Sequence, residues 1–431
     1  MYKYLFEKNN HLYLTMLLVL PLLLTSCGKD DVTSEPVTPQ QPEQPKDPEQ
    51  PTTPQAPTTT FLPLHVEGQF LVDSDGQRHV LHGFAQTYSP WFNERGTKWN
   101  NYDVKACLAY NQGLIDDIIA AGWEMTFVRM HMDPYWSNTP GVHTTGENDI
   151  SAFDFDRFKK YLDEVFVPMA EYAITKKMYV VMRPPGVCPE EIAVGDNYQK
   201  YLLKVWEWVA QHPKLKNNGY VMFELANEPV RITHGAGEGF MELKQFFQPI
   251  VNVIRQYSNN IVLVPGLGWQ SNYAGFANHP IEGKNIGYAV HCYPGWYNSG
   301  VEDNVSVNYE DFKRGWNTQI APVAKTNPIV VTEMDWAPAK YNSSWGKAVT
   351  GVAGGTGFGA NFIRIADETC NVSWLIFTSP ELLAKYKDEA PDGSSFLTDP
   401  QACPRPTYRK YKYYASEEYA QKINDPSYMF Q

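Results

Sequence analysis

Residues 220–229 read YVMFELANEP, an apolar run typical of a buried strand, and the run closes on Asn227, Glu228 and Pro229. A carboxylate at the end of a buried strand costs stability unless it is paired or used by the protein. The fold around this strand therefore decides whether Glu228 is a structural ion-pair partner or a functional group.

Seven further β-rich runs resemble this one, and amphipathic stretches of helical length separate them. The eight runs are 79–86, 125–133, 178–186, 220–229, 261–269, 285–296, 328–336 and 372–380. The predicted helices are 105–121, 154–177, 196–211, 238–257, 308–324, 358–369 and a last one at 410–423. Strand–helix alternation implies a parallel sheet with covered faces. Eight such units, without a dinucleotide-binding fingerprint after the first strand, predict an α/β fold of the (β/α)8 TIM barrel type.

The residues before the first run predict a β-hairpin that caps the bottom of the barrel. This segment, 64–80, contains Asp73 and Asp75. We interpret both as turn residues rather than calcium ligands, because no distal glutamate completes a calcium loop. The glycine-rich stretch 354–361 follows no strand directly, so we expect a loop that leads into a helix.

Polar residues gather at the ends of several runs, where a barrel of this type has its active site. Glu228 ends the fourth run and Glu333 lies in the seventh, so both are expected to face one pocket. Paired carboxylates at a pocket are typical of glycoside hydrolysis. Strict strand alternation would put Asn227 and Glu228 on opposite faces, so both reach the pocket only if the strand twists or bulges there. The other polar residues at run ends are Arg129, His131, His291 and Tyr293.

Three motifs, Phe223–Pro229 (FELANEP), His291-Cys-Tyr293 and Val331-Thr-Glu333, resemble glycoside hydrolase family 5. The resemblance covers nearly all of 61–431. It implies that Glu228 is the catalytic acid/base and Glu333 the nucleophile of a retaining mechanism.

The same resemblance implies roles for neighbouring residues. Asn227 would hold the sugar 2-hydroxyl, His291 and Tyr293 would bond near the two carboxylates, and Arg129 would lie beneath Glu333. An arginine beside a nucleophile lowers its pKa and keeps it ionised. Glu224, four residues before Glu228, is interpreted as a buried partner of a strand arginine, with Arg129 as the candidate.

Two positions depart from the family pattern. Arg183 stands at the end of the third strand, where family members carry a histidine, and His131 is the candidate substitute. Phe377 stands where the family commonly has a tryptophan platform. Both departures concern the sugar that is bound rather than the chemistry.

Aromatic residues in the loops after the strands predict a glycan cleft, because an aromatic face suits the apolar face of a pyranose. Trp269 and Trp336 are the two that we expect to bind substrate. For any single residue of this set, packing in the core is the alternative. The set is Trp91, Tyr135, Trp136, Trp269, Trp296, Tyr297, Trp336 and Trp345.

These features predict an endo-β-glycanase that acts on β-1,4-linked glucan, as a cellulase does. A β-mannanase or a xyloglucanase of the same family is the alternative within the enzyme class. An exo-acting glycosidase and a non-catalytic surface glycan-binding protein also remain open, although binding alone does not require both glutamates.

The first 60 residues predict export and tethering rather than a folded domain. Residues 1–27 have a charged start, an apolar run and the tetrapeptide Leu24-Thr-Ser-Cys27, which resembles a bacterial lipobox with Cys27 as the lipidated residue. An ordinary signal peptide cleaved elsewhere is the alternative. Lys29-Asp30-Asp31 resembles the surface-export signal of Bacteroidetes lipoproteins. The Pro/Thr/Gln-rich stretch 28–60 reads as a semi-rigid linker. The sequence thus predicts a hydrolase domain at 61–431, lipid-anchored to the outer membrane and exposed at the cell surface.

Charge and cysteine content narrow the range of possible binding partners. The net charge of −12 over 431 residues argues against nucleic acid, whose phosphates require basic patches. The five cysteines beyond Cys27 are widely spaced without a CxxC pair, which fits neither a zinc site nor a disulfide framework, and leaves one bridge possible. We expect no metal, no cofactor and a monomer whose partner is a β-linked glycan.

Overall fold

The computed structural model describes residues 61–86, 101–293, 295–299, 309–334, 358–377, 380–385 and 405–431. These residues belong to one compact unit, Phe61–Gln431. The predicted signal peptide and linker lie outside the described residues, as do Cys27, Trp91, Trp336, Trp345 and the stretch 386–404. Within the described part of the chain, every helix is too short or too polar to cross a membrane.

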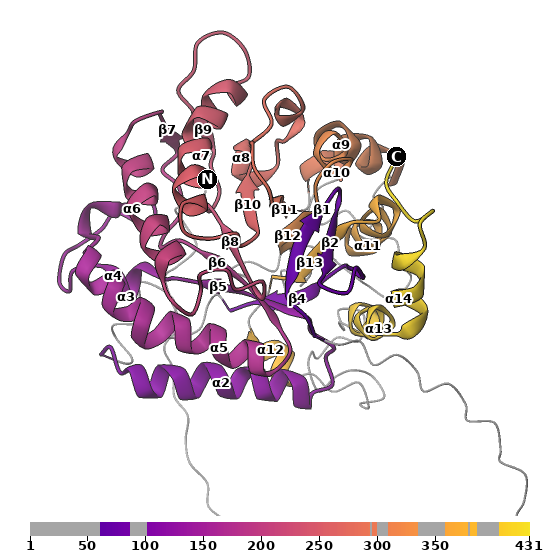
Figure 1. Cartoon of the computed structure of the whole chain (residues 1–431), viewed down its shortest axis with the longest axis horizontal. Helices are drawn as coiled ribbons and strands as arrows, with labels where there is room; N and C mark the ends of the chain where they lie inside the picture. Colours follow the sequence, from indigo (N-terminus) through magenta and orange to yellow (C-terminus); the bar gives the residue numbers. More distant parts are fainter. Residues whose placement is uncertain are drawn as a thin grey trace, which may run out of the picture. The chain divides into compact units, whose positions relative to one another are not determined.

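Eight parallel strands close into a barrel at the centre of the domain (Figure 1). Each of the eight predicted runs contributes one strand, which confirms the predicted (β/α)8 fold. Around the barrel the strands are β4 (His82–Ala85), β5 (Phe127–His131), β6 (Tyr179–Arg183), β8 (Val221–Glu224), β10 (Val262–Pro265), β11 (Ile286–Cys292), β12 (Ile329–Met334) and β13 (Val372–Ile376).

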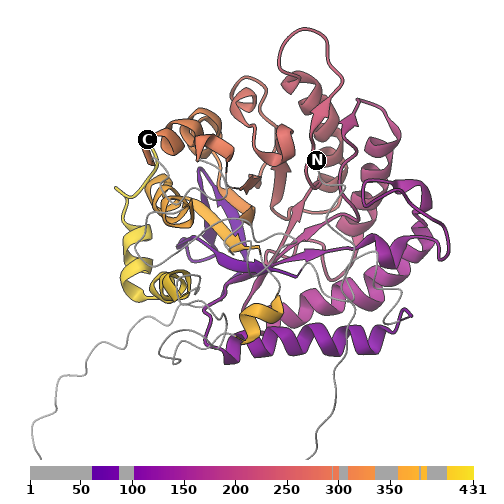
Figure 2. The ribbon, with the colours of Figure 1, turned by 180° about the vertical axis from the view of Figure 1, so that it is seen from behind.

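Helices surround the barrel on its outer side (Figures 1 and 2). In α7 (Phe240–Arg255), Leu243, Phe246, Phe247 and Ile250 are buried at helical spacing and so form the stripe that packs inward. The other outer helices are α2 (Val104–Ala120), α4 (Phe155–Tyr161), α5 (Val167–Thr175), α6 (Asn197–Gln211), α9 (Tyr309–Gln319), α10 (Ala321–Ala324) and α11 (Phe358–Thr369).

Some predicted helices have different bounds. The stretch 154–177 contains a π-helical turn, Leu162–Phe166, between α4 and α5. The predicted helix 410–423 is two helices, α13 (Arg405–Tyr414) and α14 (Glu417–Asn424). They are separate because Ser416 accepts a hydrogen bond from the Tyr419 N–H and so caps a new helix. Five short elements had no signal in the sequence: α3 (Pro134–Ser137), β7 (Glu191–Ile192), β9 (Arg231–Ile232), α8 (Leu267–Gln270) and α12 (Pro380–Lys385).

The interior of the barrel changes from apolar to polar along the strands. Phe127, Met222, Ala289 and Val330 belong to the inner apolar cluster. Side chains two residues apart on a strand share a face, so the next inward positions hold Arg129, Glu224, His291 and Thr332. All four of these polar residues are buried. The C-terminal ends of the strands therefore carry a polar layer above an apolar core.

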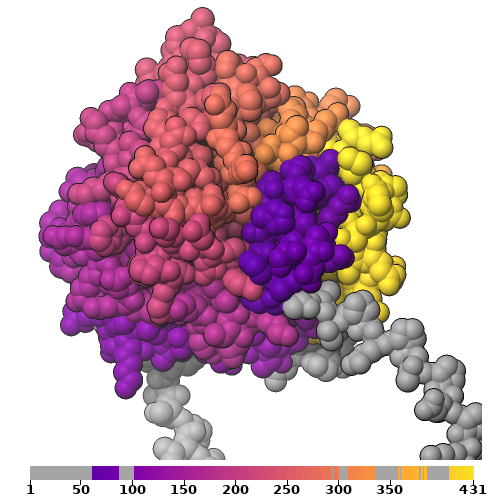
Figure 3. All heavy atoms as spheres, in the orientation of Figure 1, coloured from indigo at the N-terminus to yellow at the C-terminus, as the bar shows by residue number. Residues whose placement is uncertain are grey.

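A small antiparallel sheet covers the opposite, N-terminal end of the barrel. It consists of β1 (Leu64–Glu67), β2 (Phe70–Asp73) and β3 (Arg78–His79), so the predicted hairpin has a third short strand. The Leu64 N–H donates to the carbonyl of Gly219, just before β8. Asp73 accepts from the N–H groups of Asp75 and Gln77, as expected of a turn residue. Figure 3 shows this segment in indigo, set among the later parts of the chain.

The C-terminal residues are bonded to this small sheet. The Arg78 N–H donates to Asn424, and its guanidinium donates to the carbonyls of Ile423, Asp425 and Tyr428. Gln69 exchanges two hydrogen bonds with the backbone of Phe430. The C-terminal residues near 430 thus pack with the small sheet near residue 70 as one structural unit.

Candidate active site

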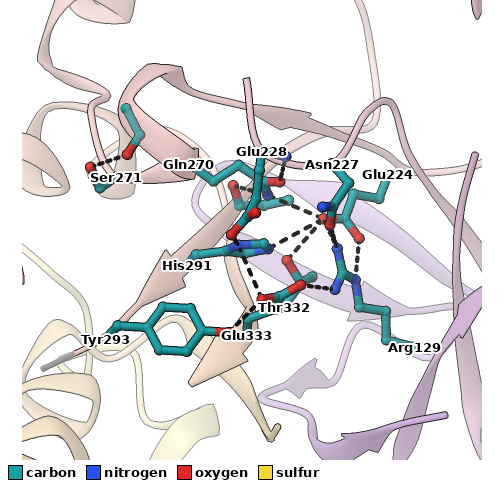
Figure 4. A network of polar contacts seen from close by, with 12 residues as sticks. Arg129, Glu224, Asn227, Glu228, Gln270, Ser271, His291, Tyr293, Thr332 and Glu333 are labelled. Atoms are coloured by element: carbon teal, nitrogen blue, oxygen red, sulfur yellow. Dashed lines mark hydrogen bonds and ion pairs between the residues drawn. The ribbon is translucent and has the colours of Figure 1, made fainter. Parts of the chain in front are cut away.

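A buried arginine organises the polar layer. Arg129 on β5 is 1% exposed, and its Nε and Nη2 donate to the two carboxylate oxygens of Glu224 at 2.7 and 2.9 Å. Its Nη1 donates to Oε1 of Glu333 at 2.7 Å, and Nη2 also donates to Oδ1 of Asn227 at 2.6 Å (Figure 4). Burial alone would lower the pKa of Arg129, but the charges of Glu224 and Glu333 outweigh it and raise that pKa. The guanidinium is therefore a permanent cation shared by three side chains.

Glu224 is the structural carboxylate of the site. It is fully buried at the end of β8, and besides Arg129 it accepts hydrogen bonds from Thr332 Oγ1 at 2.9 Å and Gln270 Nε2 at 3.1 Å. The predicted pairing of Glu224 with Arg129 is confirmed. With four donors around it, Glu224 holds the network together.

The backbone after β8 leaves the strand conformation. The strand ends at Glu224, and Glu228 has a φ of +58°, a left-handed conformation that few non-glycine residues adopt. This departure removes the alternation that would separate neighbouring side chains. Asn227 consequently bonds to Arg129 while Glu228 points to His291. Strain of this kind persists only where the surroundings impose it, and functional sites are where it concentrates.

Glu333 lies in a buried cationic environment. Tyr293 donates its hydroxyl to Oε2 at 2.5 Å, and His291 Nδ1 lies 3.5 Å from the same oxygen. Burial raises the pKa of Glu333, but His291, Arg129 and the Tyr293 hydroxyl together lower it below its usual range. A register shift in the β11–β12 pairing between Val290 and His291 places His291 beside Glu333. The carboxylate is thus held ionised.

Glu228 and Glu333 approach each other across His291. Nδ1 of His291 lies 3.0 Å from Oε1 of Glu228, and one oxygen of each carboxylate and a His291 nitrogen all lie within 4.8 Å of one another. Three such atoms could also surround a cation, but the hydrogen bond between His291 and Glu228 and the 3.5 Å contact between His291 and Glu333 already account for their approach. The Glu228 side chain is 23% exposed and that of Glu333 8%. A buried anion beside a more accessible carboxyl group can carry out nucleophilic and acid–base chemistry on one substrate.

Three comparisons with known proteins bear on this geometry. The family model for cellulase (glycosyl hydrolase family 5) matches residues 86–376. The chain belongs to glycoside hydrolase family 5. Its predicted family and fold are therefore confirmed.

Relatives within the family are distant in sequence. An endoglucanase from Halalkalibacter akibai is 24% identical over 65% of this chain, and a cellulase from Thermoanaerobacterium sp. is 27% identical over 38%. The matches span only 32% and 39% of those proteins' own lengths. A solved β-glucanase from Saccharophagus degradans, 17% identical, aligns over 83% of this chain and 95% of its own with a TM-score of 0.56, which supports the fold.

The remaining predicted site residues of this family 5 chain differ in how they relate to the network. His131 is buried and lies 3.2 Å from Asp133, and its described contacts do not reach Glu228 or Glu333. Phe377 is 4% exposed and lies edge-on to Tyr293, with ring centroids 6.5 Å apart. Trp269 is 50% exposed. Trp336 lies outside the described residues, and substrate contact by the other three stays a prediction.

Other aromatic residues of the predicted cleft are part of the core. Trp136 is fully buried and Tyr135 is 4% exposed, because Tyr135 stacks on Tyr102 and Trp136 packs edge-on to Tyr161. For these two, packing is the correct reading. Trp296 is half-buried, edge-on to Tyr293.

Arg183 lies where the resemblance to family 5 led us to expect a histidine. It ends β6, where its register partner on β5 is His131, and it donates to the carbonyl of Gly186 at 2.6 Å. Burial and the charge of Arg129 lower its pKa. Arg183 thus ties the strand to the loop that follows it.

Two members of the network were missed in the sequence. Thr332 and Gln270 both donate to Glu224. Thr332 directly precedes Glu333, and Gln270 follows the fifth β-rich run, so each is a polar residue at a strand end. That signal was present but was applied only to charged and aromatic residues and to Asn227. The described cysteines, Cys107, Cys188, Cys292 and Cys370, are free thiols, and Cys403 lies outside the described residues.

Proposed function

We propose that the protein is a retaining endo-β-glycanase that hydrolyses β-1,4-linked glucan by double displacement. The observation that carries this proposal is the pair Glu228 and Glu333, whose oxygens lie within 4.8 Å through His291. Retaining enzymes hold their two carboxyl groups about 5–5.5 Å apart, because the second must reach the sugar directly.

In the first step, Glu333 attacks the anomeric carbon while Glu228 protonates the departing glycosidic oxygen. The C–O bond to the leaving sugar breaks and a glycosyl ester on Glu333 forms. In the second step, Glu228 takes a proton from water, and that water attacks the anomeric carbon and releases Glu333. Arg129 and Tyr293 keep Glu333 ionised before the first step. In the second step, their hydrogen bonds stabilise the Glu333 carboxylate as it leaves the anomeric carbon.

The substrate class follows from resemblance and from one exposed ring. Several relatives are endoglucanases or cellulases by name, and a solved relative is a β-glucanase in complex with cellotetraose. Trp269 stands half exposed, next in sequence to Gln270, which contacts the backbone of Glu228. An accessible indole beside the catalytic loop suits the apolar face of a glucose ring.

Product sizing after incubation with soluble β-glucan, β-mannan and xyloglucan tests the substrate. We expect β-1,4-glucan to fall to oligosaccharides of mixed length. Release of a single short product would indicate exo action, and turnover of mannan alone would overturn the glucan assignment.

Alanine variants test the two roles. Glu333→Ala should abolish turnover of every substrate, since no glycosyl ester can form. Glu228→Ala should lose about 10²–10⁴-fold on glucan but retain the first step on an aryl glycoside with an acidic phenol, which leaves without protonation. Azide should then restore Glu228→Ala turnover as the β-glycosyl azide, and Glu333→Ala as the α-azide. Swapped products would reverse the two roles, and full activity in both variants would refute the catalytic assignment.

We also propose that Cys27 carries a lipid that anchors the enzyme as a monomer on the outer face of a Gram-negative cell. Support comes from the lipobox-like Leu24–Cys27, the acidic residues after Lys29 and the Pro-rich stretch to residue 60. Cys27→Ala should move the protein from the membrane to the soluble fraction, while protease added to intact cells should cleave the wild type. A variant that stays membrane-bound, or a wild type in the soluble fraction, would contradict the anchor.

A further inference from the structure

The loop after β10 has an unusual backbone. Gly268, Trp269 and Gln270 have φ angles of 60°, 58° and 61°, so three successive residues are left-handed. Two of them are not glycine, and each such residue costs energy that the surroundings must offset. The turn sends neighbouring side chains in opposite directions, since Trp269 is 50% exposed and Gln270 is fully buried.

Gln270 uses both ends of its amide inside the site (Figure 4). Its Oε1 accepts the backbone N–H of Glu228 at 2.6 Å. Its Nε2 donates to Oε1 of Glu224 at 3.1 Å and to the carbonyl of Ala289 at 3.2 Å. One side chain therefore joins the left-handed Glu228 to the buried carboxylate that holds Arg129.

Backbone bonds fasten the same two loops together. The N–H of Gly268 donates to the carbonyl of Val230 at 2.9 Å, and that of Trp269 to the carbonyl of Pro229 at 3.0 Å. Ser271 Oγ closes the turn by donating to the carbonyl of Gly268 at 2.6 Å. Residues 228, 229 and 230 are thus each held by the loop after β10.

We propose that Gln270 is a positioning residue for the acid/base Glu228, an inference that rests on the proposed function. The bond to the Glu228 N–H holds that residue at positive φ and so directs its carboxyl group toward His291 and the scissile oxygen. The site requires an acceptor for an N–H and a donor for a carboxylate on one side chain, and a neutral amide supplies both.

Two substitutions separate the two ends of the amide. Gln270→Met has similar length and loses both bonds. Gln270→Glu keeps an acceptor for the Glu228 N–H, and because burial beside Glu224 favours its protonated form, it also keeps a donor for that carboxylate. Gln199→Met is the matched control, because Gln199 is also buried, accepts one backbone N–H at 2.6 Å, and donates to two acceptors, here the carbonyls of Gln245 and Phe246 between α6 and α7.

The readout is the ratio of kcat/KM for glucan to the rate of the first step on an aryl glycoside with an acidic phenol. Gln270→Met should lower this ratio about 10- to 100-fold, because misplacement of an acid by about 1 Å can cost that much. Gln270→Glu and Gln199→Met should keep the ratio within about threefold of wild type, by the same reasoning.

Three results would overturn the proposal: an unchanged ratio in Gln270→Met, an equal fall in Gln199→Met, or a fall in Gln270→Glu as large as in Gln270→Met. If Gln270→Met does not fold, Gln270→Leu, which also loses both bonds, takes its place: the same fall in the ratio is expected, and an unchanged ratio in Gln270→Leu refutes the proposal. Failure of the proposed function itself is distinguishable, because Glu228→Ala would then show no dependence on the leaving group.

Discussion

The two ends of the barrel each bind an arginine, and the two arginines differ in their partners. At the C-terminal end, Arg129 is buried and bonds to the side chains of Glu224, Asn227 and Glu333. At the N-terminal end, Arg78 is half-buried, lies 4.0 Å over the ring of Phe70 and donates to backbone carbonyls. The bonds of Arg78 to backbone carbonyls stabilise the fold. The bonds of Arg129 to acidic side chains also stabilise the charged forms of those side chains.

A histidine–carboxylate pair at each end makes the same point. His79 lies 2.8 Å from Asp73 in a turn, and Asp73 also accepts two backbone N–H groups. His291 lies 3.0 Å from Glu228, whose backbone N–H is bonded by Gln270 and whose carboxyl group is partly exposed. The Asp73 carboxylate is occupied by hydrogen bonds within its turn, whereas the Glu228 carboxyl group stays partly accessible to a substrate.

The largest contrast is expected from replacing the two arginines. Arg129→Met should abolish activity and lower the free energy of unfolding by about 3–5 kcal/mol, because it leaves buried carboxylates without a counter-ion. Arg78→Met should lower that free energy by only about 1–2 kcal/mol and leave kcat intact, since it loses hydrogen bonds to carbonyls. Denaturant unfolding and assays on both variants check this. Equal losses of stability would erase the distinction between the two ends.

A smaller effect is expected from Tyr293→Phe, which removes one hydrogen bond to Glu333. A hydrogen bond to a charged group contributes about 1.5–3 kcal/mol, and one pKa unit corresponds to about 1.4 kcal/mol. Loss of this bond should raise the pKa of Glu333, so the acidic limb of the pH profile of kcat/KM should move up by about one unit or more.

Tyr297→Phe is the control for this shift. The Tyr297 hydroxyl donates to the carbonyl of His291 at 3.3 Å, which is a backbone partner. Its removal should leave the acidic limb in place. An equal shift in both variants would mean that phenols near the site act through packing alone.

The smallest effect is expected at the N-terminal end, from Asp73→Asn. Burial raises the pKa of Asp73, but hydrogen bonds from His79 and the Gln77 backbone outweigh it and lower that pKa below 3.8. The ionised Asp73 therefore stabilises the fold at pH values above 3.8, and this stabilisation is lost as the pH falls through the lowered pKa of Asp73. Asp73→Asn should lower unfolding free energy by about 1 kcal/mol at neutral pH and lose less on acidification, with unchanged kcat. Thermal midpoints at neutral and acidic pH check this.

The barrel was predictable because its signals are local. Each run such as 220–229 alternates with a helix. The site residues were found because polar residues such as Glu228 and Glu333 lie at the ends of apolar runs, within motifs that resemble family 5. The pairing of Glu224 with Arg129 followed from depth along a strand.

What escaped prediction depends on backbone that leaves regular geometry. The left-handed conformations of Glu228 and Gln270 arise from contacts between loops 42 residues apart, which no local pattern encodes. The division of 410–423 into α13 and α14 turned on one capping serine, Ser416. Tyr135 and Trp136 read as cleft residues because a four-residue helix that packs them inward has no periodic signal.

The two hydrogen bonds between Gln69 and the backbone of Phe430 also limit when the small sheet can be completed during synthesis. The two residues are 361 positions apart, so at about 5–20 residues per second a ribosome needs roughly 20–70 s to make the second after the first. During that interval β1, β2 and β3 lack their C-terminal partners and expose strand edges to other nascent chains. Late completion of an early strand slows folding, since contacts of long sequence separation form last. The small sheet can therefore be completed only after residues near 430 have been made.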